Sequence, residues 1–222
     1  MDQEEARELL RTIDPSAAKS LVTSVAEELD GLAAQVWAFG LAEGARRALA
    51  IVAQMGAELA VGACLLYESN RWYAGAALVR QLIEVEYLLF LFATEPSEAE
   101  RWLAAPPDEV RRMFSPKNMR ERSKGRFRAS EYDVHCEVGG HPRVRGHVLL
   151  REHLTPLQHD PLDLFDPGVQ WVDLAQHVER MWGHYVAAVA IHSPTNVYPD
   201  RFDKVSTQIA AWRESDPRAA QL

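Results

Sequence analysis

Apolar residues recur at helical spacing along most of this chain. The first stripe follows Asp14-Pro15, a pair typical of a helix start because Asp caps the first turn and proline fits into it. Its members lie three or four positions apart and therefore share one helix face: Leu21, Val25, Leu29 and Leu32. A similar face follows residue 168 and consists of Trp171, Leu174, Val178, Met181, Tyr185 and Val189. Amphipathic helices are thus predicted in both the first and the last quarter of the chain.

The same pattern, followed along the whole chain, predicts an all-α protein with about four long helices. We expect long helices from residue 14 to the mid-thirties, at 41–67, at 71–92 and at 168–192, and short ones at 97–104, 107–113 and 203–212. Prolines at 116, 142, 156, 161 and 167 exclude long helices from residues 114–167, where an irregular segment is expected. We predict a single helical domain: N-terminal helices over 1–38, a bundle core over 40–192 and a polar tail over 193–222.

Two apolar stretches, 48–67 and 74–93, approach the length of a membrane span. The first contains Glu58 and the second contains Arg80, Glu84 and Glu86, and charges in the middle of a span are costly in lipid. We therefore expect buried bundle helices and no membrane contact. The acidic, polar start shows no cleavable signal, and two cysteines are too few for a disulfide framework. A cytoplasmic protein with reduced thiols is expected.

Charge is distributed unevenly along the chain. Residues 111–151 hold eleven Lys and Arg against four acids, a balance of +7, which leaves −15 for the rest of a chain of net charge −8. The overall acidity argues against a protein that coats nucleic acid. The basic segment suits RNA or a nucleotide-like ligand with phosphate groups, or else it is a solvated surface that pairs with acidic helices.

All eight histidines lie between positions 135 and 192. Since histidine titrates near neutrality and binds metals, chemistry is expected in this part of the chain. His141 lies in a Gly-Gly-His-Pro sequence, which predicts a turn or helix junction. His177 and His184 share a helix face with Met181 and are interpreted as core histidines, although Asp173 and His177 have the spacing of an acid–imidazole pair.

Zinc-type donors occur at His135, Cys136, His141 and His147, but their spacing matches no closed zinc module. No P-loop, dinucleotide fingerprint, Gly-x-Ser-x-Gly or His-Glu-x-x-His motif is present, so we expect neither cofactor nor metal. Histidine and arginine together can cleave RNA without metal, since one moves a proton and the other steadies the phosphate. The sequence offers several pairings for this chemistry: Arg128 with His135, and Arg143 or Arg145 with His141.

The apolar helix at 71–92 carries Arg80 and Glu84, which are four residues apart and so lie on one face. A charge among apolar neighbours must be paired or must face a polar site. Two interpretations remain open: an ion pair that ties helices together, and a polar site shared with the histidine segment.

The order of these features resembles the HEPN superfamily (higher eukaryotes and prokaryotes nucleotide-binding domains), in particular a bacterial branch known as a domain of unknown function. The resemblance covers roughly residues 40–190. It rests on the Arg80-x-x-x-Glu84 element followed by Tyr87, and on the element that runs from Tyr132 through Cys136 to His141-Pro142. Asp133 stands where relatives often have arginine. The resemblance implies a helical bundle, commonly dimeric, in which His141 and the Arg80–Glu84 pair line one site.

From this resemblance we expect a metal-independent ribonuclease or an effector of a toxin–antitoxin or phage-defence system. His141 would act as acid and base, with arginine on the phosphate; the candidate site residues are Arg80, Glu84, Arg128, His135, His141 and Arg143. Expected partners are RNA or a nucleotide at the basic segment, a second copy of the chain, and a partner or antitoxin protein. The main alternative is a non-catalytic helical module that binds a protein or a nucleotide-like ligand. A third hypothesis is a helical metalloprotein that uses the His/Cys cluster, which metal analysis of the purified protein would test.

Overall fold

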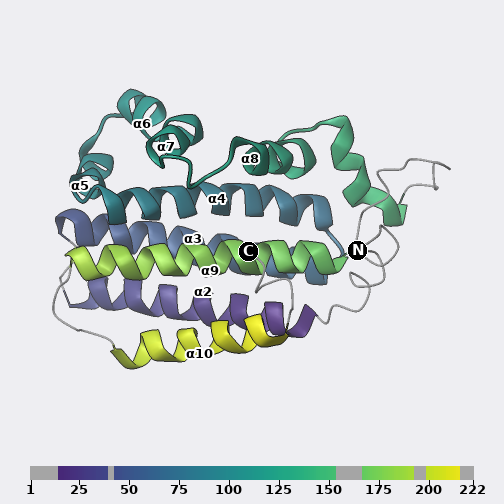
Figure 1. Ribbon diagram of the computed structural model, residues 1–222, viewed down its shortest axis with the longest axis horizontal. Coiled ribbons are helices and arrows are strands. Elements are labelled where there is room, and N and C mark those ends of the chain that lie inside the picture. Colours follow the sequence, from purple (N-terminus) through teal and green to yellow (C-terminus); the bar gives the residue numbers. More distant parts are fainter. Residues whose placement is uncertain (1–14, 40–42, 154–166, 193–198, 216–222) are drawn as a thin grey trace.

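The computed structural model describes residues 15–39, 43–153, 167–192 and 199–215. Within these ranges the chain is almost entirely helical and contains no strand, which confirms the predicted all-α class. Four long helices form the bundle (Figure 1): α2 (Pro15–Ala38), α3 (Gly44–Glu68), α4 (Trp72–Thr94) and α9 (Pro167–His192). They pack in the order α2, α3, α4, α9, and α9 closes the ring on α2.

The apolar stripes predicted from the sequence face the middle of this ring. Leu21, Leu82, Ile83 and Leu174 are fully buried there and belong to one continuous core. Each such side chain contributes roughly 1.5–3 kcal/mol to folding. By length and composition α3 could cross a membrane, and half of its most apolar window is buried inside the bundle.

Helices α4 and α9 run in the same direction. The contacts show this because residue numbers rise together along the two helices. Glu86 contacts His177, Phe90 contacts His184, and Phe92 contacts His192. The chain between them must therefore return to the end of the bundle where α4 began. This return path carries much of the candidate chemistry.

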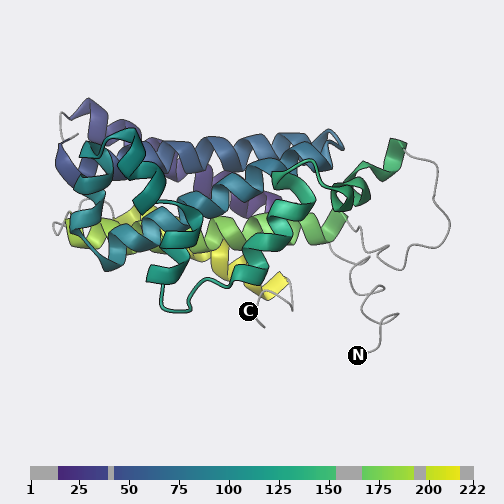
Figure 2. The ribbon, with the colours of Figure 1, turned by 90° about the horizontal axis from the view of Figure 1, so that it is seen from above.

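Four short helices form the return path and lie across α4 (Figures 1 and 2): α5 (Ser97–Ala104), α6 (Pro107–Met113), α7 (Pro116–Arg122) and α8 (Ala129–His135). A π-helical turn, η1 (Cys136–Gly140), and a 3-10 segment, η2 (Val144–His153), follow. The sequence predicted the first two of these helices and, from residue 114 on, an irregular segment. Its prolines do prevent long helices, but Pro116 lies in the first turn of α7, where the Ser115 hydroxyl caps the amide of Asn118 at 3.3 Å.

The last helix, α10 (Pro199–Ser215), is longer than the predicted 203–212. It packs against α2, where Val205 and Trp212 are buried and Lys204 pairs with Glu28 at 3.1 Å. This region has a polar composition and few apolar positions, so the sequence pattern gave too short a helix.

Candidate functional site

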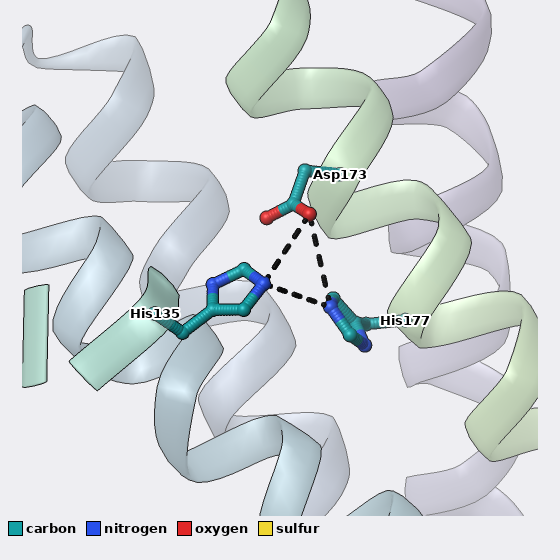
Figure 3. Close-up of side chains that lie close together, drawn as sticks. All are labelled: His135, Asp173 and His177. Carbon is teal, nitrogen blue, oxygen red and sulfur yellow. Dashed lines mark hydrogen bonds and ion pairs between the residues drawn. The ribbon is translucent and has the colours of Figure 1, made fainter. Parts of the chain in front are cut away.

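Three side chains that can bind metal converge between α8 and α9. His135 is the last residue of α8, while Asp173 and His177 are one turn apart on α9, and Figure 3 shows all three pointing toward one centre. The two histidine Nε2 atoms are 3.3 Å apart. Asp173 Oδ1 lies 3.5 Å from His135 Nε2 and 3.7 Å from His177 Nε2. The three ligand atoms thus form a nearly regular triangle.

Local structure explains why these residues meet. Positions four apart on a helix share a face, so α9 presents Asp173 and His177 together. On α8, the buried Tyr132 packs against α4, with its ring 6.1 Å from that of Tyr87. His135 follows Tyr132 by three residues and therefore lies on nearly the same face of α8. Anchoring Tyr132 against α4 turns His135 toward α9.

Behind the triangle lies a buried layer of charged groups. Glu86 and His177 are each 1% exposed, and Glu86 Oε2 is 2.8 Å from His177 Nδ1. Arg180 lies against this pair, with its Nε 3.1 Å from Glu86 Oε1, and its Nη2 donates to Glu131 at 2.7 Å. Buried carboxylates are tolerated when such partners satisfy them, so this layer fixes the position of the His177 ring.

Burial and charge set the protonation of His177 and Glu86. Burial lowers the pKa of His177 to about 3, although Asp173 opposes the shift, so the ring is neutral at physiological pH. Burial raises the pKa of Glu86 to about 7, against the influence of Arg180. Nη2 of Arg180 also lies 2.8 Å from His177 Nδ1, and an arginine only donates, so Nδ1 has two competing neighbours: it donates to the Glu86 carboxylate or accepts from Arg180. In the tautomer that donates from Nδ1 to Glu86, the lone pair of Nε2 points to the centre of the triangle.

The three side chains of the triangle differ in exposure. The exposed fraction of the side chain rises from 1% at His177 through 13% at His135 to 29% at Asp173. Asp173 is therefore the most exposed of the three groups. Either a proton shared between the two imidazoles or a metal cation bound by all three groups can occupy that centre.

A second polar cluster surrounds Arg80. Its Nη1 pairs with Glu84 at 2.7 Å, Tyr132 donates its hydroxyl proton to Glu84 at 2.9 Å, and Arg80 itself donates to the Tyr132 oxygen. The predicted Arg80–Glu84 ion pair is thus present and ties α4 to α8.

The Gly139-Gly140 turn packs directly on this part of α4. A Cβ atom on Gly139 would come within 2.6 Å of the Ala76 carbonyl carbon, and one on Gly140 within 2.4 Å of Arg80 Cδ. The hydroxyl of Tyr73 donates to the His141 carbonyl oxygen at 3.1 Å. The His141 junction accordingly lies beside the Arg80 cluster.

The remaining predicted site residues are not gathered in one place. Arg128 precedes α8 and is exposed, as are His141 and Arg143. Among the residues whose side chains the structure describes, His135 groups with Asp173 and His177 rather than with Cys136 or His141; the side chain of His147 lies outside that description. Of the six predicted residues, Arg80 and Glu84 meet at one cluster and His135 belongs to the other.

Sequence reasoning missed most of the buried layer. Glu86 was noticed only as a charge in an apolar helix, and His177 only as a core histidine paired with Asp173. A signal for α9 was present, since Asp173, His177 and Arg180 follow helical spacing on one face. No such signal connects them to Glu86 and Glu131, which come from other elements.

Comparisons of this chain with protein-family models, with curated proteins and with solved structures gave no match. The resemblance to HEPN proteins therefore stays a prediction.

Proposed function

We propose that this protein binds a divalent transition-metal ion of the zinc class through His135, Asp173 and His177. The separations of 3.3, 3.5 and 3.7 Å among the three ligand atoms carry this proposal. Zinc bonds to nitrogen and carboxylate oxygen are about 2.0–2.2 Å, which in a tetrahedron separates the ligand atoms by about 3.3–3.6 Å. Two imidazoles and one carboxylate also suit zinc chemically.

The surroundings of His177 support the same proposal. A metal-bound histidine usually donates its other ring N–H to a carboxylate or carbonyl, which fixes its tautomer and raises its basicity. Glu86 Oε2, 2.8 Å from His177 Nδ1, fills this role. Because the ring is neutral at physiological pH, metal binding at Nε2 need not displace a proton from it.

The number of ligands favours a reactive site. Structural zinc sites have four protein ligands, whereas catalytic sites have three and keep a position for water or substrate. Among the residues that the structure describes, three ligands converge, and Asp173 is the most exposed of them. A zinc-bound water there would have a pKa near 7 and would be a hydrolytic nucleophile.

Metal titration of the purified full-length chain tests this proposal. After chelation and dialysis, we expect the wild type to bind one zinc ion, counted by mass spectrometry of the metal and by competition with a chromophoric chelator. Asp173→Asn and His135→Asn should each weaken binding at least about 100-fold, since each removes a ligand or its charge. His141→Asn and His192→Asn are matched controls that should bind zinc like the wild type. Equal loss in the His141 variant, or a wild type without tight zinc, would refute the site.

A metal-independent ribonuclease is the second candidate function. The observation that favours it is the packing of Gly140 on the Arg80 side chain, which sets the exposed His141 beside the Arg80–Glu84 pair. A ribonuclease assay with chelator present separates the two candidates. The ribonuclease proposal requires cleavage that survives chelator and disappears in His141→Ala; cleavage that zinc restores after chelation would instead support the metal site.

A further inference from the structure

Among the described residues, much of the positive charge of the basic segment takes part in no ion pair. Of its ten Lys and Arg with described side chains, four form ion pairs with acids: Arg111, Lys117, Arg122 and Arg145. Six have no ion pair among the described residues: Arg112, Arg120, Lys124, Arg126, Arg128 and Arg143. Compensation by the acidic helices therefore accounts for only part of the segment. Unpaired cations attract anions.

Arg120 differs from the other five because its guanidinium is partly enclosed. Its Cζ lies 4.7 Å from the centre of the Tyr132 ring, and its Nη1 is buried without a hydrogen-bond partner among the described residues. A buried cationic donor without an acceptor is costly, so a group with lone pairs is expected to meet it.

Tyr87 supplies a second unsatisfied donor beside the same ring, that of Tyr132. Its side chain is 1% exposed and stacks on Phe127, while its hydroxyl is buried and has no partner in the described part of the chain. Tyr132 is the common neighbour of Tyr87 and Arg120, at ring distances of 6.1 Å and 4.7 Å. Burial raises the pKa of Tyr87 well above its ordinary value, although Arg120 opposes the shift, so the hydroxyl keeps its proton and can donate.

We propose that the junction of α4, α7 and α8 binds a phosphate group through the Arg120 guanidinium and the Tyr87 hydroxyl. Both groups are donors and one is a cation, so the acceptor they fit is an oxyanion with several lone pairs. Phosphate meets that requirement, and charge-assisted bonds from arginine to phosphate are among the stronger hydrogen bonds. This subsite goes beyond the metal proposal and does not depend on it.

The phosphate subsite lies next to the proposed metal site, and this position indicates which class of ligand it would bind. Tyr132 and His135 are one turn apart on α8, and Tyr87 follows Glu86 on α4, so the two sites are neighbours along both helices. This step alone rests on the proposed metal site: a phosphate held at Arg120 would anchor a ligand whose reacting group lies at the metal. The ligand class is a phosphate ester, either a terminal monoester or a diester within a nucleotide chain.

Calorimetry on the full-length protein in chelator tests the subsite separately from the metal. The probes are inorganic phosphate, a 5′-phosphorylated RNA trinucleotide and the same trinucleotide with a 5′-hydroxyl. Arg120→Gln should weaken phosphate binding about tenfold, which corresponds to the loss of one charge-assisted hydrogen bond. Preference for the phosphorylated trinucleotide would assign a monoester, and equal binding of both trinucleotides a diester.

Two further variants make the test decisive. Tyr87→Phe keeps the stacked ring but removes the hydroxyl, so it should fold normally and still weaken phosphate binding several-fold. Arg112→Gln removes an exposed, unpaired cation from the same segment and should change binding less than about twofold, because it acts only through the general field. Phosphate binding unchanged in Tyr87→Phe, or lost equally in Arg112→Gln and Arg120→Gln, would overturn the proposal. Retained phosphate binding in a protein that fails to bind zinc would refute the metal proposal alone.

Discussion

Glu86 does not reach the centre of the ligand triangle. Of the residues outside the triangle, it is the one on which the candidate metal site depends most. It is buried, it lies against His177 Nδ1, and Arg180 balances its charge. Its role is to orient and polarise the imidazole, whose other nitrogen faces the ligand triangle. Such a partner commonly changes metal affinity 10–100-fold when it is altered.

Glu86→Gln tests this positioning role. The amide can still accept the His177 proton, but it lacks the negative charge, so zinc affinity should fall about tenfold or more while the fold is kept. Competition titration with a chromophoric chelator measures the change, and cobalt substitution reports whether the coordination geometry is preserved. Glu58→Gln, which changes an exposed carboxylate on α3, is the control and should leave zinc affinity unchanged.

The burial of His184 allows a prediction of how the stability of the protein depends on pH. It packs against Phe90 and Phe127, and burial lowers its pKa to about 4, against an ordinary value of 6.5. The unfolded chain therefore binds a proton between pH 6.5 and 4 that the folded chain does not, and the free energy of unfolding falls as the pH falls through this window.

The contribution of His184 to acid sensitivity is about 3 kcal/mol across that window. His184→Gln removes the titration, so its loss of stability from pH 7 to pH 4 should be smaller than that of the wild type by about this amount. Urea unfolding at a series of pH values, with chelator present, measures the difference. Parallel pH profiles for the two proteins would contradict the assignment.

At the scale of elements, the turn η1 depends on glycine where it touches α4. A Cβ on Gly139 would meet backbone atoms of Ala76 and Ala77 within 2.6–2.8 Å, and backbone cannot move aside as a flexible side chain can. Gly139→Ala should therefore lower the free energy of unfolding by about 1–3 kcal/mol.

Gly183 provides the matched control. It lies within α9, and a Cβ there would meet nothing within 4 Å. Gly183→Ala should stabilise the protein by about 0.5–1 kcal/mol because alanine is the better helix former. Thermal or urea unfolding of both variants measures the two effects, and the prediction fails if they have the same sign.

Long helices could be predicted from the sequence within a few residues because their apolar period repeats over several turns. Short helices were harder: α5 and α6 were predicted, whereas α7 and α8 were not, since seven residues show little periodicity and prolines lie close by. The candidate site could be predicted only in part. His135 was named, but its partner His177 is 42 residues away, and Glu86 is 91 residues from His177. A single sequence carries no signal of contacts between residues so far apart in the chain.

At the scale of the whole molecule, the proposed metal joins the return path to the bundle. His135 comes from the segment laid across α4, whereas Asp173 and His177 belong to a core helix. A metal bound by all three would add a bond network between two parts of the chain that the Glu131–Arg180 ion pair already connects, and it would bind the folded state only.

Zinc should therefore raise the melting temperature of the wild type. At a free concentration 100 times the dissociation constant, the expected stabilisation is about 2.7 kcal/mol. For a chain of this size that corresponds to an increase of about 5–10 °C, measured by circular dichroism. Asp173→Asn should show little increase, and an equal increase in both proteins would indicate zinc binding elsewhere.

The wide turn η1 lies between His135, in the ligand triangle, and His141, at the Gly-Gly-His-Pro junction. A change in the length of this turn would move His141 without moving His135. The amide of His141 bonds to the carbonyl of Cys136, five residues back, so this turn holds one residue more than an α-turn would. Deleting one residue here would rotate everything that follows by about 100° and would remove His141 from Tyr73. His135 precedes the turn and would keep its place. Insertions and deletions at 136–140 can thus rearrange the Gly-Gly-His-Pro junction while they leave the ligand triangle intact.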